Sequence, residues 1–364
     1  MPLFDTVAAT PALLIDHDVL DRNIERMAMS ARTRGVTLRP HAKTHKCPDI
    51  ARLQIAAGAA GLTVATVSEA EVFADAGFGD LFVAYPLWVD AARGARLAAL
   101  AERARVTAGI DSAEGARALA AHAGTGIDVL VEVDSGHHRT GVAPGHAGAV
   151  AAAAAEAGLT VAGVFTFPGH SYGPGRPGDA ATDESAALRT AADSLLAAGI
   201  APGILSGGST PTAHLDTSAT ELRPGVYVFG DAQQLELGTI TEAEVALTVL
   251  ATVVSVRDGV VVLDAGSKSL GADRAPWATG YGRILGVPDA RITALSEHHA
   301  TVAWPSARGT RTGGPDVAPP GLGSRLRVVP NHVCTAVNLA DELVVVRGCA
   351  VVDHWPVSAR GCTI

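Results

Sequence analysis

The sequence predicts an α/β fold, with a (β/α)8 TIM-like barrel followed by a C-terminal all-β domain. From about residue 20 to 235, eight apolar strand-like runs alternate with alanine-rich amphipathic segments, a pattern typical of a parallel sheet closed into a barrel. After about residue 238, short β-rich runs with Gly and Asp turn signals replace that alternation. A doubly wound open sheet is the alternative for the first part, and the count of eight strands favours the barrel.

Each expected element follows from a local pattern. The eight strand candidates are VTLRPH, LTVAT, LFVAY, VTAGID, VLVEVD, VAGVFTF, GILSGG and VYVFG, at residues 36–41, 62–66, 81–85, 106–111, 129–134, 161–167, 203–208 and 226–230. The clearest helical segments are at 90–105 and 178–199. In the second part, β-rich runs occupy 246–266, 291–304 and 326–339, and the Gly- and Pro-rich stretch 306–324 is expected to be a loop.

These elements define three parts of the chain. We expect residues 21–237 to form the barrel and residues 238–364 to form the β domain. Residues 1–20 contain one strand candidate, which we expect to join the β domain. The sequence has no internal repeat.

Composition limits the class of function. The 28 Lys and Arg residues against 37 Asp and Glu give a net charge of −9, so we expect no nucleic-acid partner, because a phosphate-binding surface needs excess positive charge. No apolar run approaches the roughly 20 residues of a membrane span. The start MPLFDTVAATPALL lacks the pattern of a signal peptide, and the four cysteines form no CxxC pair. These features predict a cytoplasmic protein without membrane contact.

The stretch LRPHAKTHKC at 38–47 places Lys43 just after the first predicted strand. In a barrel, residues at the carboxyl ends of the strands face the active site. A lysine withdrawn there from bulk water loses its proton more easily and can form an imine with an aldehyde. A solvated surface lysine is the alternative, and Lys46 is expected to be that solvated residue. Arg39, His41 and His45 are expected to surround or orient Lys43.

A second stretch, SGGSTPT at 206–212, follows the seventh predicted strand. Its two glycines let backbone N–H groups approach a phosphate, and Ser209 and Thr210 add hydroxyl donors. Loops after the seventh and eighth strands commonly bind phosphate in barrels. A reactive lysine together with a phosphate-binding turn predicts pyridoxal phosphate, an aldehyde that carries a phosphate.

Seven ordered motifs carry a resemblance to a known family. They are RPHAKTHK, VEVDSGHHRTGV, GHSYG, SGGSTPT, ELRPGVYVFGD, LDAGSKSL and PNHVC. In this order they resemble the motifs of pyridoxal-phosphate enzymes of fold type III that include D-serine dehydratase and D-threonine aldolase. The resemblance covers nearly the whole chain and implies a barrel of the alanine racemase N-terminal type. It is specific for the family and less so for the substrate.

The resemblance assigns expected roles around the cofactor. Lys43 is implied as the Schiff-base lysine, Arg139 as the neighbour of the phenolic oxygen, and Tyr172 as the neighbour of the pyridine nitrogen. The implied phosphate-binding residues are Gly207, Gly208, Ser209 and Thr210, with Tyr227. From the residues alone, Arg139 could instead pair with Asp134 or another carboxylate, and Tyr172 could be a half-buried packing residue.

The motif PNHVC suggests a metal site. His332 and Cys334 lie two apart on a predicted strand, so both side chains are expected on one face. Imidazole and thiolate can bind one metal, and the sulfur favours zinc, although two satisfied core residues is the commoner explanation for such a pair. The resemblance implies a divalent-metal site beside the cofactor, holding Zn, Mn or Mg.

The resemblance also implies the reaction class, which is lysis of D-3-hydroxy amino acids. Dehydratases of the family carry His-x-Cys and D-threonine aldolases carry His-x-Asp, so Cys334 favours a D-serine dehydratase type that gives a 2-oxo acid and ammonia. The alternative is a D-threonine aldolase that gives glycine and an aldehyde. An amino-acid racemase and a non-catalytic pyridoxal-phosphate carrier are further alternatives.

Two positions depart from the family pattern. Many relatives have histidine where Phe167 stands, and glutamate where His298 stands. His170 and His299 remain the candidates for acid–base catalysis. Family members place the β domain of one subunit over the barrel of another, so a homodimer is expected. The sequence leaves open whether the metal ligands serve their own barrel or that of a partner.

Overall fold

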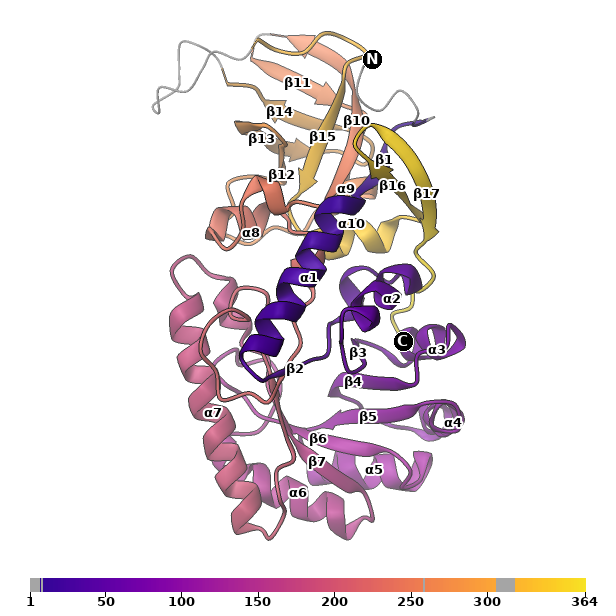
Figure 1. Ribbon diagram of the computed structural model, residues 1–364, viewed down its shortest axis with the longest axis vertical. Coiled ribbons are helices and arrows are strands. Elements are labelled where there is room, and N and C mark those ends of the chain that lie inside the picture. Colours follow the sequence, from indigo (N-terminus) through magenta and orange to yellow (C-terminus); the bar gives the residue numbers. More distant parts are fainter. Residues whose placement is uncertain (1–6, 8, 258, 306–317) are drawn as a thin grey trace. The chain divides into compact units, whose positions relative to one another are not determined.

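The computed structural model describes residues 7, 9–257, 259–305 and 318–364, in two compact units (Figure 1). The barrel unit comprises Glu25–Lys43, Pro48–Gly225 and Cys362–Ile364. The β unit comprises the described residues up to Ile24, then Thr44–Cys47 and Val226–Gly361. Most of the expected loop 306–324, namely residues 306–317, lies outside the described residues.

Eight parallel strands form the barrel. They are β2 (Thr37–Leu38), β3 (Leu62–Val64), β4 (Asp80–Pro86), β5 (Arg105–Ile110), β6 (Asp128–Glu132), β7 (Thr160–Phe165), β8 (Ile204–Gly207) and β9 (Glu221–Leu222). Their order is β2-β9-β8-β7-β6-β5-β4-β3, and a parallel bridge between His41 and Thr63 joins the two ends. The TIM-like barrel is therefore confirmed, and the open sheet is excluded.

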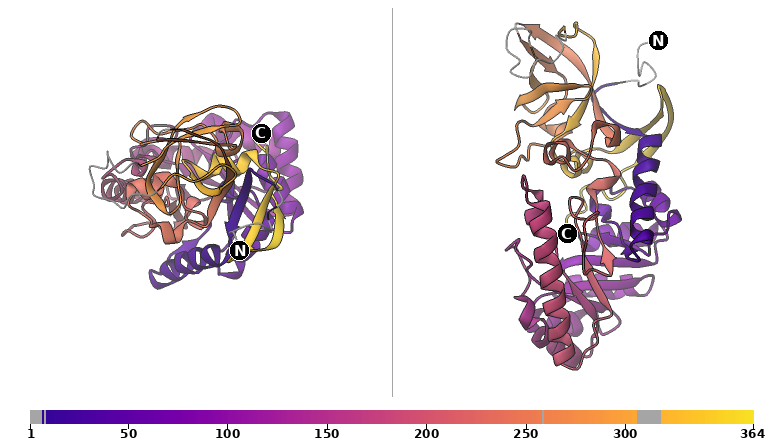
Figure 2. Two further views of the ribbon diagram at one scale, coloured as in Figure 1. Left: turned by 90° about the horizontal axis from the view of Figure 1, so that it is seen from above. Right: turned by 60° about the vertical axis from the view of Figure 1, so that its left-hand side comes forward.

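Helices cover the outside of this sheet. They are α2 (Pro48–Ala56), α3 (Val67–Asp75), α4 (Ala91–Ala101), α5 (Ala113–Ala123), α6 (Ala147–Glu156) and α7 (Pro177–Ala197), preceded by α1 (His17–Thr33). Thr66, Asp90 and Ser112 each accept a backbone N–H bond at the start of a helix, which fixes where α3, α4 and α5 begin. The right-hand view of Figure 2 shows the long helix α7 running beside the barrel strands. No helix among the described residues has the length and apolarity to cross a membrane.

The eighth strand lies earlier in the chain than predicted. The run VYVFG at 226–230 is not a strand, because Val226–Val228 form a 3-10 turn, η4. The eighth strand is Glu221–Leu222, which pairs with β8 on one side and β2 on the other. A strand of two residues is too short to show an alternating pattern. The apolar residues that suggested a strand, Val226 and Val228, are instead buried in the turn.

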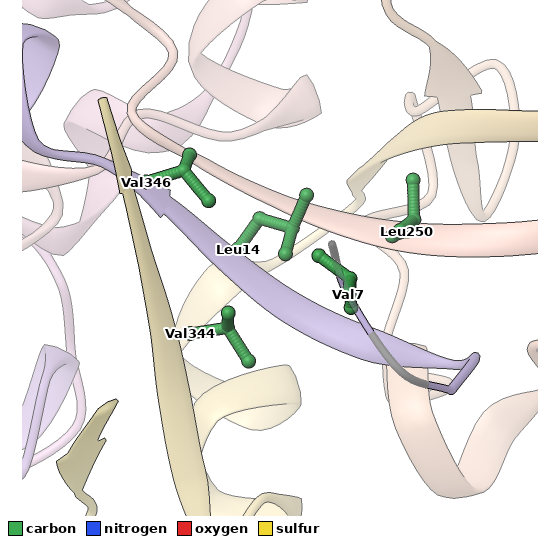
Figure 3. Close-up of a cluster of buried hydrophobic side chains, with 5 residues drawn as sticks. All are labelled: Val7, Leu14, Leu250, Val344 and Val346. Carbon is green, nitrogen blue, oxygen red and sulfur yellow. The ribbon is translucent and has the colours of Figure 1, made fainter. Parts of the chain in front are cut away.

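The β unit contains a nine-stranded sheet. Its strands are β1 (Ala12–Asp16), β10 (Leu247–Arg257), β11 (Val260–Leu263), β12 (Gly282–Ile284), β13 (Val287–Leu295), β14 (Ala300–Ala303), β15 (Arg325–Pro330), β16 (Glu342–Arg347) and β17 (Ala350–Pro356). Strand β1 lies antiparallel to β10 and parallel to β16. Figure 3 shows Leu14 of β1 among Val7, Leu250, Val344 and Val346, a buried apolar cluster. The N-terminal strand is thus held in this unit by apolar packing as well as by backbone hydrogen bonds.

Three short helices complete the β unit: α8 (Ala232–Leu237), α9 (Ser267–Leu270) and α10 (Val333–Leu339). The β-rich run expected at 326–339 is therefore only half correct. Strand β15 ends at Pro330, and the rest of the run begins helix α10. An apolar run this short does not distinguish a strand from a helix, because periodicity needs more residues to show.

Close packing of β7 against β8 leaves no room for a side chain at Gly163. A Cβ atom at this position would collide with the carbonyl oxygen of Ile204 on the neighbouring strand. We expect Gly163→Ala to lower the free energy of unfolding by about 1–3 kcal/mol, as overpacking does. Gly178→Ala is the matched control, because Gly178 is exposed in α7 and an added Cβ meets nothing within 4 Å. Urea unfolding followed by circular dichroism checks this, and equal midpoints for the two variants would contradict it.

Candidate active site

Lys43 lies in the 3-10 turn η1 (Ala42–Thr44), directly after barrel strand β2. The sequence has only two other lysines. Lys268 forms an ion pair with Glu297 at 2.8 Å. Lys46 is 6% exposed and donates to the carbonyl oxygen of Ala359 at 3.3 Å, so the expectation that Lys46 is solvated is wrong. Lys43 is therefore the lysine that the fold places at the carboxyl end of a barrel strand.

The residues expected around Lys43 have structural partners. Arg39 donates to Glu221 at 2.7 Å and to Asp80 at 2.6 Å, so it ties β2 to β9 and β4. Burial lowers the pKa of Arg39, but the carboxylates of Glu221 and Asp80 more than offset this and raise it. His45 is fully buried and its Nδ1 accepts the backbone N–H of Cys47. Both residues thus fix the backbone on either side of Lys43.

Four side chains of the candidate site lie near the ring of Phe167. The Lys43 ammonium lies 5.6 Å from the ring centroid, and the Arg139 guanidinium lies 5.4 Å from it. The rings of His137 and Tyr172 lie 5.5 and 6.2 Å away, centroid to centroid. The structure therefore brings together Lys43, Arg139 and Tyr172, which come from loops after three different strands. Cations near an aromatic face are held by the ring quadrupole.

A loop after β6, held by hydrogen bonds to Asp134, carries Arg139. Oδ1 of Asp134 accepts the backbone N–H groups of Gly136 and His138, and its Oδ2 lies 2.6 Å from Nδ1 of His138. Burial raises the pKa of Asp134, but these hydrogen bonds outweigh it and lower the pKa. The alternative pairing of Arg139 with Asp134 is not observed, because His138 occupies that carboxylate. Arg139 itself is exposed.

Glu132, at the end of β6, is a buried acid that sequence reasoning missed. Its side chain is 3% exposed, and its Oε2 atom is buried without a hydrogen-bond partner. Burial raises the pKa of Glu132, while a hydrogen bond from Thr140 and the charges of Arg139 and Arg223 act in the opposite direction. The signal in the sequence was the single acid inside the apolar run VLVEV.

The turn after β8 is glycine-rich and buried. The N–H of Gly208 donates to Oε1 of Glu184 at 2.5 Å, and the N–H of Ser209 donates to Oγ1 of Thr212 at 3.0 Å. Ser209 also contacts the hydroxyl of Ser171 at 2.8 Å. A Cβ atom at Gly207 would collide with Oε1 of Glu184, so any larger residue there would require the Glu184 side chain to move. Two glycines next to the hydroxyls of Ser209 and Thr210 make a turn that suits a phosphate.

The remaining cofactor and acid–base candidates take different positions. Thr210 is buried in the same turn, whereas Tyr227 is buried in η4 of the β unit. His170, in η3 (Gly169–Tyr172), places Nε2 3.3 Å from Asp183 and leaves Nδ1 buried without a hydrogen-bond partner. His299 is exposed in the turn between β13 and β14, next to the equally exposed His298.

Contrary to the prediction, His332 and Cys334 do not lie on a strand. His332 is the N-cap residue of α10, and Cys334 is the second residue of that helix. The geometry still makes them neighbours, because the charge and a hydrogen bond of Cys334 act on the His332 ring. The Cys334 thiol also lies 3.4 Å from the hydroxyl of Thr44. The pair is therefore positioned by a helix start instead of by the alternation of a strand.

Asp273 orients the His332 ring. Its Oδ2 hydrogen-bonds Nδ1 of His332, and its Oδ1 accepts the Thr335 hydroxyl at 2.6 Å. Burial lowers the pKa of His332, but Cys334 and Asp273 together raise it to about 11. An imidazolium beside a thiol and a carboxylate is a place where a divalent cation can replace the proton. Metal-bound histidines usually donate their other N–H to such a carboxylate.

The described residues contain no group of three or more His, Cys, Asp or Glu side chains that could hold a metal. His332 and Cys334 would supply two protein ligands and leave other coordination positions open. Imidazole and thiolate donors suit zinc, and open positions are what a catalytic metal requires for water and substrate.

Asp231 is a second buried acid that the sequence did not reveal. Its side chain accepts the N–H of Gln234 at 2.9 Å and that of Val333 at 3.2 Å, so it caps both α8 and α10. Burial raises the pKa of Asp231 to about 6, although His332 acts in the opposite direction. By fixing the first turn of α10, Asp231 sets where His332 and Cys334 lie.

The role of Asp273 can be tested through metal affinity. Asp273→Asn removes the charge that orients His332, and we expect it to weaken zinc binding about 10–100-fold, as loss of such partners does. Competition with a chelating dye measures the affinity without any need for activity. Asp289→Asn is the matched control, because Asp289 is exposed on β13. Equal zinc affinity for the two variants would show that Asp273 does not support a metal ligand.

Two protein-family models match this chain. The model "Alanine racemase, N-terminal domain" matches residues 15–233, and the model "Putative serine dehydratase domain" matches residues 246–346. The first match alone covers more than half of the sequence, and the two together cover most of both units.

Relatives with assigned names match over nearly the full length. The chain is 36% identical to the D-threonine aldolase of Arthrobacter sp over 368 residues, which cover 97% of this chain and 93% of the relative. The structure of D-threonine aldolase from Filomicrobium marinum matches with a TM-score of 0.85 at 34% identity, covering 98% of this chain and 97% of that chain.

A dehydratase matches equally well. The structure of D-threo-3-hydroxyaspartate dehydratase from Delftia sp. HT23 has a TM-score of 0.86 at 33% identity, covering 98% of this chain and 99% of that chain. Further structures of that dehydratase are a histidine-to-alanine mutant and, two positions on, a cysteine-to-alanine mutant in the metal-free form.

Proposed function

Because this chain belongs to the D-serine dehydratase and D-threonine aldolase family of pyridoxal-phosphate enzymes, within the alanine racemase N-terminal fold, we propose that it is a lyase of D-3-hydroxy amino acids. The reaction we propose is dehydration and deamination to a 2-oxo acid and ammonia. It uses pyridoxal phosphate and a divalent metal, Zn²⁺, Mn²⁺ or Mg²⁺.

The gathering of Lys43, Arg139 and Tyr172 around Phe167 is the observation that carries this proposal. These side chains supply an amine, a fixed cation and a phenol, which suit the aldehyde, the phenolic oxygen and the ring nitrogen of the cofactor. The turn at Gly207 and Gly208 suits its phosphate. Bound pyridoxal phosphate would delocalise the negative charge that develops at the substrate Cα.

Each residue of the candidate site then has a defined role. Lys43 removes the Cα proton as the general base, at the place where the strand end holds it. Arg139 provides the positive charge of a guanidinium group, which favours the phenolate form of the cofactor. His332 and Cys334 hold the metal, which would polarise the β-hydroxyl as a Lewis acid. Asp273 keeps the His332 ring in one tautomer.

The choice of dehydration over aldol cleavage rests on Cys334. The dehydratase from Delftia has a histidine and a cysteine at the same spacing in its mutant structures, and one structure of the cysteine mutant is of the metal-free form. D-threonine aldolase activity is the second candidate, because relatives of that name match just as well. In the aldolase reaction the substrate β-hydroxyl would lose its proton and the Cα–Cβ bond would break, to give glycine and an aldehyde.

Product analysis distinguishes the two reactions. Purified protein with pyridoxal phosphate and Zn²⁺ or Mn²⁺ receives D-serine, D-threonine and their L-enantiomers. We expect a 2-oxo acid and ammonia from the D-enantiomers alone, and loss of both when a chelator removes the metal. Glycine and acetaldehyde from D-threonine would assign the aldolase reaction and reject Cys334 as the deciding residue. No product from any of the four, with cofactor bound, would contradict both proposals for these substrates.

A further inference from the structure

Glu184 of helix α7 lies directly beneath the glycine turn after β8. Its side chain is 1% exposed, and its Oε1 atom accepts the N–H of Gly208 at 2.5 Å. The same oxygen occupies the space that a side chain at Gly207 would need. The turn is therefore built around a carboxyl group, although Glu184 is 20 or more residues away in sequence.

A carboxyl group is an unexpected support for a turn that suits a phosphate. A phosphate monoester carries a charge close to −2 above its second pKa of about 6, so an ionised Glu184 would repel it. The cation that acts on Glu184 is Arg223, which is also shared with Glu221 and Glu132. On α7 itself, the neighbouring Asp183 is engaged with His170 at 3.3 Å. Among the described residues, Glu184 therefore shares the positive charge of Arg223 with two other acids.

We propose that Glu184 is a positioning residue for cofactor phosphate, which holds the Gly207–Gly208 turn as an uncharged acid and weakens phosphate binding when it ionises. A protonated carboxyl keeps a carbonyl oxygen that accepts the Gly208 N–H, so the shape of the turn does not need the charge. This inference rests on the proposed function, because it takes the turn as the phosphate site.

The direction of the pH dependence follows from the burial of Glu184. Burial raises its pKa to about 7, although the Gly208 hydrogen bond and Arg223 act in the opposite direction. A bound phosphate raises that pKa further, because it disfavours a second negative charge. By linkage, the affinity for pyridoxal phosphate is highest below pH 7 and falls as the pH rises through about 7.

The test compares dissociation constants for pyridoxal phosphate, measured by absorbance titration of the apoprotein at about pH 6 and about pH 8.5. Between the lower and the higher pH, we expect the dissociation constant of the wild type to increase by a factor about ten times larger than that of Glu184→Gln. One pKa unit of coupling between Glu184 and the phosphate corresponds to a factor of about ten. Glu184→Gln keeps the acceptor for Gly208 without the charge. Asp193→Asn, at an exposed position of the same helix, is the matched charge control and should behave as wild type.

Two further measurements keep the test decisive. Glu184→Leu removes the acceptor, and we expect weaker binding at both pH values, restored by Gln. With wild-type protein, pyridoxal, which lacks the phosphate, should show no such loss of affinity at high pH, so the idea is testable even if a variant fails to fold. The same pH dependence for Glu184→Gln and wild type, or for pyridoxal and pyridoxal phosphate, would overturn this inference. Absence of pyridoxal phosphate binding to wild type at either pH would instead contradict the proposed function.

Discussion

The guanidinium of Arg223, buried inside the barrel, is the interaction on which the candidate site depends. It donates to Oγ of Ser206 at 2.5 Å and to the carbonyl oxygen of Thr166 at 2.6 Å. Burial lowers its pKa, and three buried acids oppose that shift: Glu221, Glu184 and Glu132. A buried cation is costly without partners, so acids around Arg223 offset the cost of burying its charge. The ends of strands β7, β8 and β9 are thereby held to one another.

Each partner of Arg223 leads to a different part of the candidate site. Glu221 binds Arg39, which precedes Lys43 by four residues at the end of β2. Glu132 begins the loop that carries Arg139, and Glu184 supports the glycine turn. Thr166 is followed directly by Phe167. The groups proposed to hold the cofactor are thus presented by loops whose bases share one network of charge and hydrogen bonds, as a preorganised site requires.

The features of the fold that follow from local sequence patterns could be predicted. Alternation of strands and helices predicted the barrel, and the position of Lys43 after the first strand could be stated because the carboxyl ends of barrel strands are known to converge. The sequence could not reveal the two-residue strand at Glu221, the helix start at His332 or the burial of Lys46, since each depends on tertiary partners. The role of Glu184 could not be predicted for the same reason. Glu184 lies in an amphipathic helix, and only the folded structure brings it to the turn after β8.

The proposed function requires Lys43 to be the lysine that binds pyridoxal phosphate. Reduction of the holoprotein with borohydride, followed by peptide mass mapping, tests this directly, because the chain has only three lysines. We expect a single pyridoxyl group on Lys43, since Lys46 is buried against Ala359 and Lys268 is paired with Glu297. A pyridoxyl group on Lys46 or Lys268, or unmodified lysines throughout, would contradict it.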